Sequence, residues 1–118
     1  MTYDAPHRKT QDLLFRLKIR GYDEVNVIAT PWQERKNFQP LIPHRKFNTL
    51  GITPSELCGK LGYTFNEVKV GDINGFTSDW ILIGGAGILP TDVVQSEKVI
   101  NSHPAYLPHV RGLDSLKW

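Results

Sequence analysis

The sequence lacks the features that mark secreted and membrane proteins. It holds one cysteine, Cys58, in 118 residues, which rules out an internal disulfide and agrees with a reducing compartment. No stretch approaches the roughly 20 consecutive apolar residues of a membrane span. The first ten residues are polar and carry Asp4, Arg8 and Lys9, unlike a secretory signal. These absences predict a cytoplasmic chain with no membrane partner.

Charge and histidine content argue against two further classes. The formal net charge is +2, too small to favour nucleic acid, because non-specific binding rests on many phosphate contacts. The histidines show no metal-ligand spacing such as H-x-x-x-H, so no metal is expected. They are His7, His44, His103 and His109. The length, with 40% hydrophobic and 22% charged residues, fits one small domain over residues 1–118.

The first half of the chain predicts a helix followed by a strand. Apolar residues recur along one face of Thr10–Arg20, with Thr10 as the expected N-cap, Asp12 beside the first turn's amides and Gly21 as the stop. Val25–Thr30 is rich in β-formers and predicts a strand. Helix, glycine and strand in this order form the second half of a β-α-β unit, whose strands lie parallel.

The second half continues the alternation. Thr53, Pro54 and Glu56 have the spacing of a capping box that opens a helix over Ser55–Leu61, in which Cys58 is expected to be a buried structural thiol. The further elements expected are strands at Tyr63–Val70, Trp80–Ile83 and Lys98–Asn101, and a brief helix at Pro90–Ser96. This pattern predicts an open, mostly parallel α/β sheet. Ligands bind such sheets at the carboxyl ends of the strands, here Gly84–Leu89 and Ser102–Gly112.

Asn101 and His103 carry the chemistry that the segment VINSHPAYLPHVRG suggests. Two residues apart on extended chain, their side chains project to the same face. An amide N–H can donate to the oxygen of a tetrahedral intermediate, and an imidazole can move protons near neutral pH. The alternative is that Asn101 caps a turn while His103 hydrogen-bonds the backbone.

The whole segment N-x-H-P-x-x-L-P-x-x-R-G resembles the signature loop of the folate-dependent formyltransferases, which act on glycinamide ribonucleotide, methionyl-tRNA or nucleotide-linked aminosugars. Upstream, WILIGGAGILP is similar to that family's apolar strand, glycine break and Ile-Leu pair. The resemblance is strong over Trp80–Gly112 and weaker over Thr10–Thr30. It implies the Rossmann-like formyltransferase fold, with a formyl group moving from 10-formyltetrahydrofolate to a small-molecule amine.

The resemblance also implies a role for each matching residue. Asn101 would polarise the formyl carbonyl, and His103 would stabilise the intermediate and shuttle protons. The residues expected to line the pterin pocket or its closing loop are Gly87, Ile88, Leu89, Leu107 and Pro108. Arg111, followed by glycine, fits the tRNA and sugar branches, and a nucleotide-linked aminosugar is the expected acceptor.

His7, Arg8 and Lys9 precede the first helix, where exposed amides and the helix dipole favour an anion. They are predicted to receive the acceptor's phosphate, with a solvated basic helix start as the equal alternative. An exposed loop position is favoured for His109.

The sequence departs from the family pattern in two ways. The family's catalytic aspartate lies a few dozen residues beyond the histidine, past Trp118, and Asp114 is too close to His103 to replace it. Met1–Pro6 is expected to be too polar and short for the first, central strand. The domain is therefore expected to be incomplete, and the chain unstable, paired with another copy or catalytically impaired. The competing functions are a non-catalytic folate- or nucleotide-binding remnant and a hydrolase that releases formate from 10-formyltetrahydrofolate.

Overall fold

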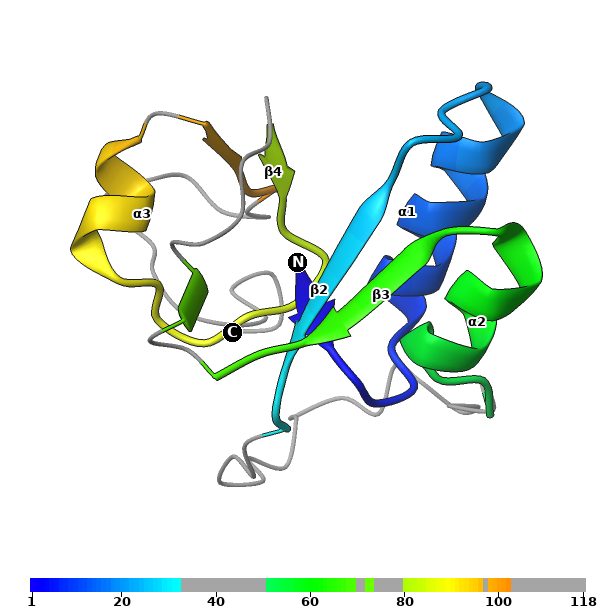
Figure 1. The fold of residues 1–118 in the computed structure, drawn as a ribbon, viewed down its shortest axis with the longest axis horizontal. Helices are drawn as coiled ribbons and strands as arrows, with labels where there is room; N and C mark the ends of the chain where they lie inside the picture. Colours follow the sequence, from blue (N-terminus) through cyan, green and yellow to red (C-terminus); the bar gives the residue numbers. More distant parts are fainter. Residues whose placement is uncertain (33–50, 70–71, 74–79, 97, 103–118) are drawn as a thin grey trace, which may run out of the picture. The chain divides into compact units, whose positions relative to one another are not determined.

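The computed structural model describes residues 1–32, 51–69, 72–73, 80–96 and 98–102. The chain divides into two compact units, one made of Met1–Gln33 with Leu50–Asn101, the other of Glu34–Thr49 with Ser102–Trp118. All the helices and strands below belong to the first unit (Figure 1).

Strands and helices alternate along the described part of the chain, as expected. In order they are β1 (Thr2–Tyr3), α1 (Arg8–Ile19), β2 (Asn26–Thr30), α2 (Pro54–Leu61), β3 (Thr64–Glu67), β4 (Ile81–Leu82), α3 (Thr91–Gln95) and β5 (Val99–Ile100). β2 pairs in parallel with β1 on one side and with β3 on the other, while β4 pairs in parallel with β5. The predicted small α/β arrangement with parallel strands is therefore confirmed.

Met1 joins the two sheets. Its amino group donates to the carbonyl of Leu82 at 2.7 Å, and its own carbonyl accepts from the N–H of Gly84 at 2.9 Å. In a parallel strand pair, one residue bonds in this way to two residues of its neighbour that are two positions apart. Backbone hydrogen bonds of Met1, the residue before β1, therefore link the three-stranded sheet β1-β2-β3 to the pair β4-β5.

Met1–Pro6, expected to be too polar and short for a central strand, contains the two-residue strand β1 at one end of the three-stranded sheet. Thr2 pairs with Ala29 and Tyr3 with Thr30, and Met1 directly before them bonds to Leu82 in β4 and to Gly84 after it. Thr2 and Tyr3 are only 1% and 4% exposed, although their sequence is polar and short. Burial between two neighbours, which no local pattern reveals, makes these two residues a strand.

α1 begins earlier than expected and ends as expected. Its N-cap is His7 and not Thr10, so Asp12 lies beyond the first turn, where it forms an exposed ion pair with Arg8 at 3.6 Å. At the other end Gly21 adopts a φ of 79°, and its N–H and that of the next residue bond back to carbonyls of the last turn. Glycine adopts this left-handed conformation without the steric cost of a Cβ, which explains the stop.

α2 confirms its predicted capping box. The Thr53 hydroxyl accepts from the Glu56 N–H at 3.3 Å, while the Glu56 carboxylate accepts from the Thr53 N–H at 2.9 Å. Pro54 occupies the first turn, where its missing N–H costs no hydrogen bond.

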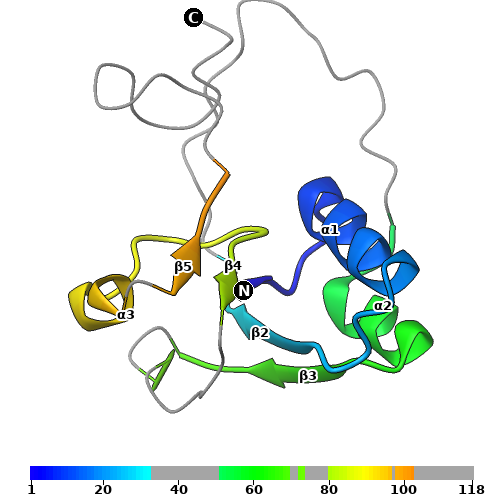
Figure 2. The same cartoon turned by 90° about the horizontal axis from the view of Figure 1, so that it is seen from above.

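The core lies between the two helices and the three-stranded sheet. α1 and α2 lie side by side on one face of that sheet (Figure 2). Their inward residues meet β2 and the start of β3 in one cluster, whose buried members are Leu14, Val27, Leu57, Cys58 and Tyr63. Cys58 is a free thiol and is completely buried, which confirms the prediction of a buried structural thiol.

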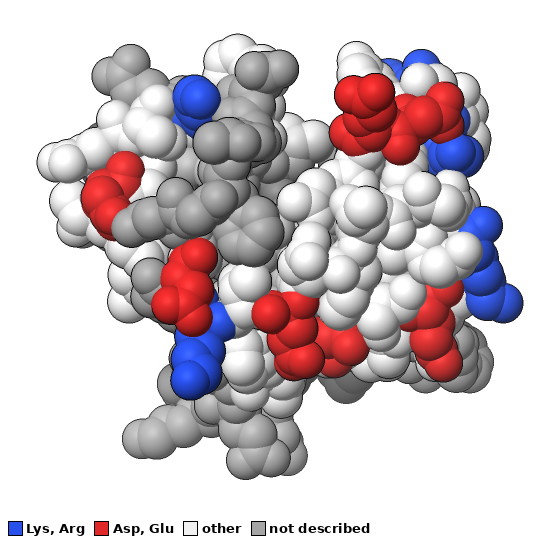
Figure 3. Space-filling model, in the orientation of Figure 1, with Lys and Arg blue, Asp and Glu red and all other residues white. Residues whose placement is uncertain are grey.

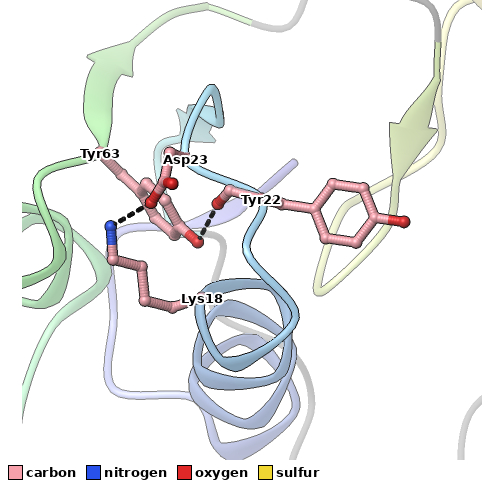
Figure 4. Close-up of polar contacts among 4 residues, drawn as sticks. All are labelled: Lys18, Tyr22, Asp23 and Tyr63. Atoms are coloured by element: carbon pink, nitrogen blue, oxygen red, sulfur yellow. Dashed lines mark hydrogen bonds and ion pairs between the residues drawn. The ribbon is translucent and has the colours of Figure 1, made fainter.

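A polar cluster fastens the amino ends of β2 and β3, opposite the predicted ligand edge. The Tyr63 hydroxyl donates to the carbonyl of Tyr22 at 2.7 Å, and Lys18 pairs with Asp23 at 2.5 Å while its ammonium lies 5.4 Å from the centre of the Tyr63 ring (Figure 4). Burial raises the pKa of the Tyr63 phenol, and the hydrogen bond to Asp23 raises the pKa of Lys18. These contacts tie the turn after α1 to β3.

Candidate functional site

The carboxyl ends of the parallel strands form the candidate site. The chain leaves β4 through Ile83, Gly84 and Gly85, and it leaves β5 at Asn101. β1 ends at Tyr3, directly before the bend that leads into α1. Because parallel strands end at one edge of a sheet, these departures lie where ligands bind to open α/β sheets.

The glycine turn after β4 packs directly against the start of α1. A Cβ built on Gly84 would lie 2.7 Å from the Thr10 hydroxyl oxygen and 3.3 Å from its Cα. A Cβ on Gly85 would lie 3.3 Å from the Tyr3 ring and 3.5 Å from Nδ1 of His7. Only a residue without a side chain fits at Gly84, so the glycines permit the close approach of backbone and helix.

Three side chains beside this turn share hydrogen bonds. The hydroxyl oxygens of Thr2 and Thr10 are 2.7 Å apart, and Nδ1 of His7 lies 3.1 Å from the Thr10 hydroxyl. The Thr2 hydroxyl also donates to the carbonyl of Tyr3 at 3.2 Å. Thr2 and Thr10 are buried, with 1% and 2% of their surface exposed, so the pair is shielded from water.

Asn101 directly follows β5, at the end of the predicted strand Lys98–Asn101. It directly follows the pair Leu82 and Ile100 in the register of β4 and β5, and Ile83 donates its N–H to the carbonyl of Ile100 at 3.0 Å. The residue is exposed, as a group that contacts a ligand must be. The structure brings Asn101 and the Gly84–Gly85 turn to the same end of neighbouring strands.

Three of the predicted pterin-binding residues, Gly87, Ile88 and Leu89, occupy the irregular segment between β4 and α3. Gly87 is exposed, Leu89 is half-buried and Ile88 is 95% exposed. Single exposed apolar residues are ordinary on protein surfaces, so the exposure of Ile88 alone does not define a site. The segment has the accessibility that a ligand contact requires.

The three predicted acceptor residues lie at the start of α1. His7 is half-buried against Gly85, while Arg8 and Lys9 are exposed. Arg8 also borders an open hollow of about 530 Å³ along α1, whose other described lining residues are Asp12, Phe15, Arg16, Ile19 and Arg20. Of the three, only His7 is shown against the glycine turn.

The remaining predicted site residues lie outside the described residues. They are His103, Leu107, Pro108 and Arg111. Their expected roles stay predictions.

Sequence reasoning missed three residues at this edge. The sequence pattern predicts no strand over Thr2 and Tyr3, and it predicts Thr10 as the N-cap of the first helix. A fourth residue, Trp32, was expected to serve packing alone. Its ring meets the Tyr3 ring edge-on, with centroids 5.3 Å apart and planes at 80°, yet 54% of Trp32 is exposed. The available sequence signal for β1 was the pair Thr2 and Tyr3, which stands a few residues before the start of α1.

Charge and metal-binding groups add no second site within the part of the chain that the structure describes. On the face drawn in Figure 3, the coloured acidic and basic side chains occur in small separate groups. Among the described residues, no three His, Cys, Asp or Glu side chains are placed to hold a metal ion. Burial raises the pKa of the Cys58 thiol to about 11, so it is not a nucleophile near neutral pH.

No protein-family model matches this chain, and no similar curated protein or solved structure was found. None of the helices in the described ranges is both long and apolar enough to span a bilayer.

Proposed function

We propose that this chain binds 10-formyltetrahydrofolate at the carboxyl edge of a Rossmann-like sheet and transfers the formyl group to an amine. The observation that carries the proposal is the position of Asn101. An exposed carboxamide follows β5 at the edge where the Gly84–Gly85 turn leaves β4, inside the sequence segment that resembles the formyltransferase signature.

The hydrogen-bonded strand order supports the Rossmann-like part of the proposal. Doubly wound sheets place their first strand in the centre and build outward on both sides, so that neighbouring crossovers diverge there. Here β1 pairs with β2, and Met1 directly before β1 bonds to Leu82 of β4 and to Gly84 after it. The divergence falls at His7 and the Gly84–Gly85 turn, which is where such sheets bind their ligands.

The chemistry assigns separate tasks to the two polar residues. The acceptor's nitrogen attacks the formyl carbon, and the carbonyl oxygen gains negative charge that the Asn101 amide N–H stabilises. His103 would move the proton from the attacking nitrogen to the departing folate nitrogen, after which the carbon–nitrogen bond to folate breaks. The products are a formamide and tetrahydrofolate.

The binding residues follow from the same arrangement. Gly87, Ile88 and Leu89 would contact the pterin together with Leu107 and Pro108. His7, Arg8, Lys9 and Arg111 would contact the acceptor, with the helix dipole of α1 favouring a phosphate. A nucleotide-linked aminosugar supplies both the amine and the phosphates that this set requires.

The test compares three proteins in two assays. A stable 5,8-dideaza analogue of the formyl donor is titrated by calorimetry against wild type, Asn101→Ala and the exposed-strand control Asn66→Ala, and formyl transfer to an aminosugar nucleotide is then measured. Asn101→Ala should keep its fold and lose transfer by about 10²–10³-fold, as when one oxyanion donor is removed. Asn66→Ala should match wild type.

Other outcomes separate the competing functions. Analogue binding without turnover identifies a binding module, and formate release that needs no amine identifies a hydrolase. A folded wild-type chain that does not bind the analogue contradicts all three folate-based functions.

A further inference from the structure

We propose that the exposed indole ring of Trp32 stacks on the base of a nucleotide-linked acceptor, beside the start of α1 at the carboxyl edge of the sheet. This inference deepens the proposed function and rests on it for the nature of the acceptor. The ligand class is a nucleoside diphosphate, in which a planar aromatic base is joined through a ribose to phosphates.

Trp32 follows β2 at the end where ligands bind to parallel sheets. β2 ends at Thr30, and Pro31 separates it from Trp32. A proline holds its φ at about −65°, which limits the directions that the chain can take as it leaves the strand. Within the described ranges, the other exposed aromatic side chains lie on α1 or before the amino end of a strand: Phe15, Tyr22 and Trp80. Trp32 is thus the one described aromatic ring that is exposed at the carboxyl end of a strand.

Tyr3 contacts the Trp32 ring without covering it. The two rings meet edge to face, with their centroids 5.3 Å apart and their planes at 80°. If the indole contributes the edge, both of its faces are clear of Tyr3, and if it contributes a face, the opposite face is clear. Because 54% of Trp32 is exposed, a flat group can reach the ring. Stacking on a base requires only such an open face.

Tyr3 also positions the indole before a ligand arrives. Its side chain is 4% exposed, and its backbone pairs with Thr30 at the end of β2. Trp32 therefore rests against a ring that is itself held by burial and by strand pairing. A ring positioned in advance loses less conformational entropy on binding than a mobile one, which favours its use as a stacking surface.

The Tyr3 ring connects Trp32 to the start of α1, where the acceptor's phosphate is proposed to bind. A Cβ built on Gly85 would lie 3.3 Å from the Tyr3 ring and 3.5 Å from Nδ1 of His7. Tyr3 and His7 therefore border the same glycine. A base on Trp32 and a phosphate beside His7 would be separated by the Tyr3 ring, a gap that the ribose and phosphates of a nucleotide can bridge.

The position of Trp32 favours the base of the acceptor over the pterin of the donor. The described residues proposed to contact the pterin, 87–89, follow β4, whereas Trp32 follows β2. β4 pairs with β5, which leads to Asn101, and β2 pairs with β1, which leads toward His7. The two planar groups of the reaction would therefore contact residues that follow different strands.

Stacking can be observed in the full chain without the formyl donor. The indole N–H signal of Trp32 is assigned as the one lost in the spectrum of Trp32→Phe, and UDP, ADP and inorganic pyrophosphate are titrated separately. We expect UDP and ADP to shift this signal, because every base has a face that can stack, and pyrophosphate to leave it in place. A folded chain that binds neither nucleotide contradicts the proposal. So does binding that leaves the Trp32 signal unmoved, or an equal shift with pyrophosphate.

Calorimetry with UDP measures how much the ring contributes to binding. Trp32→Ala should raise the Kd about 5- to 100-fold, the usual effect of removing a stacked aromatic ring. Trp80→Ala is the matched control, because Trp80 is 64% exposed but precedes β4, and it should bind as wild type does. If Trp32→Ala does not fold, Trp32→Phe takes its place and should bind UDP more weakly than wild type. A wild-type Kd in the folded variant contradicts the stacking.

Failure of the inference can be told apart from failure of the proposed function. If wild type transfers the formyl group and folded Trp32→Ala keeps the wild-type KM for the aminosugar nucleotide, the inference is wrong and the function stands. If UDP shifts the Trp32 signal but no transfer occurs, the stacking site stands and the function fails. A signal that moves with the 5,8-dideaza donor analogue and not with UDP would assign the ring to the pterin and overturn the inference.

Discussion

The carboxylate of Asp4 holds the first turn of α2 from a position 51 residues earlier in the chain. One carboxylate oxygen accepts from the backbone N–H of Ser55 at 3.1 Å, and the other accepts from its hydroxyl at 3.0 Å. The capping box satisfies the N–H of Glu56. Asp4 thus caps a donor that the local sequence cannot reach, and it ties the segment after β1 to α2.

Replacing Asp4 with alanine should destabilise the chain by about 1–2 kcal/mol, the usual effect of losing a helix cap. The Ser55 N–H would lose its protein acceptor, and α2 would lose a favourable charge at its N-terminus. Urea unfolding measures the change. Asp12→Ala, which removes only an exposed ion pair, is the control and should stay within about 0.5 kcal/mol of wild type. Equal losses in the two variants would contradict the capping role.

Gly84→Ala should destabilise the chain by about 1–3 kcal/mol, because its Cβ would collide with Thr10. Gly59→Ala is the matched control. Gly59 lies in α2 with no atom within 4 Å of a built Cβ, so alanine should stabilise that helix by about 0.5–1 kcal/mol. Opposite signs in thermal or urea unfolding are expected, and a neutral Gly84→Ala would show that the turn moves freely away from α1.

The free amino group of Met1 should make stability depend on pH. Burial lowers its pKa from 8.0 to about 6, because the charged form is poorly solvated beside β4. The folded chain therefore holds this proton less tightly than the unfolded chain, and stability should fall by about 2 kcal/mol as the pH decreases from 8 to 6. The control is a chain with an acetylated amino terminus, which keeps an N–H donor but carries no charge. The difference in stability between the free and the acetylated chain should vanish above pH 8. The same pH profile in both would contradict the prediction.

Cys58 should react with thiol reagents only through unfolding. Its side chain is fully buried, and burial followed by the charge of Asp4 raises its pKa from 9.0 to about 11. The folded state binds the thiol proton more tightly than the unfolded state, so the stability linked to this group persists below pH 9 and is lost as the pH rises toward 11. Cys58→Ala should remove that loss. A labelling rate that does not increase with urea would show a local opening instead.

Local rules predicted the elements whose signals lie within a few residues. The capping box at Thr53, the left-handed glycine at Gly21 and the strand over Asn26–Thr30 are each set by near neighbours, and each was found. The sequence did not predict β1, because two residues show no periodicity. Its pairing partners lie in β2, and those of the preceding Met1 lie in and after β4, all distant in the chain. The helix start was misplaced because Thr10 bonds to Thr2 in the fold and so does not act as a cap.

The site was predictable only in its outline. The rule for strand ends placed Asn101 and the Gly84–Gly85 turn at the carboxyl edge of the sheet. It could not reveal that the turn presses on Thr10, because that contact joins residues distant in the chain. The contact between the hydroxyls of Thr2 and Thr10 is likewise a product of tertiary packing.

The hydrogen bonds of Met1 constrain the order in which parts of the chain can fold. Residues 1 and 82 are 81 positions apart. During synthesis, Met1 can therefore form its hydrogen bond to Leu82 only after most of the described chain has been made. The β1-β2-β3 sheet with its two helices can assemble first, leaving one side of β1 exposed. Contacts of such long sequence separation slow folding and expose an open strand edge to other chains. Nascent chains halted before residue 82 should therefore be prone to aggregate.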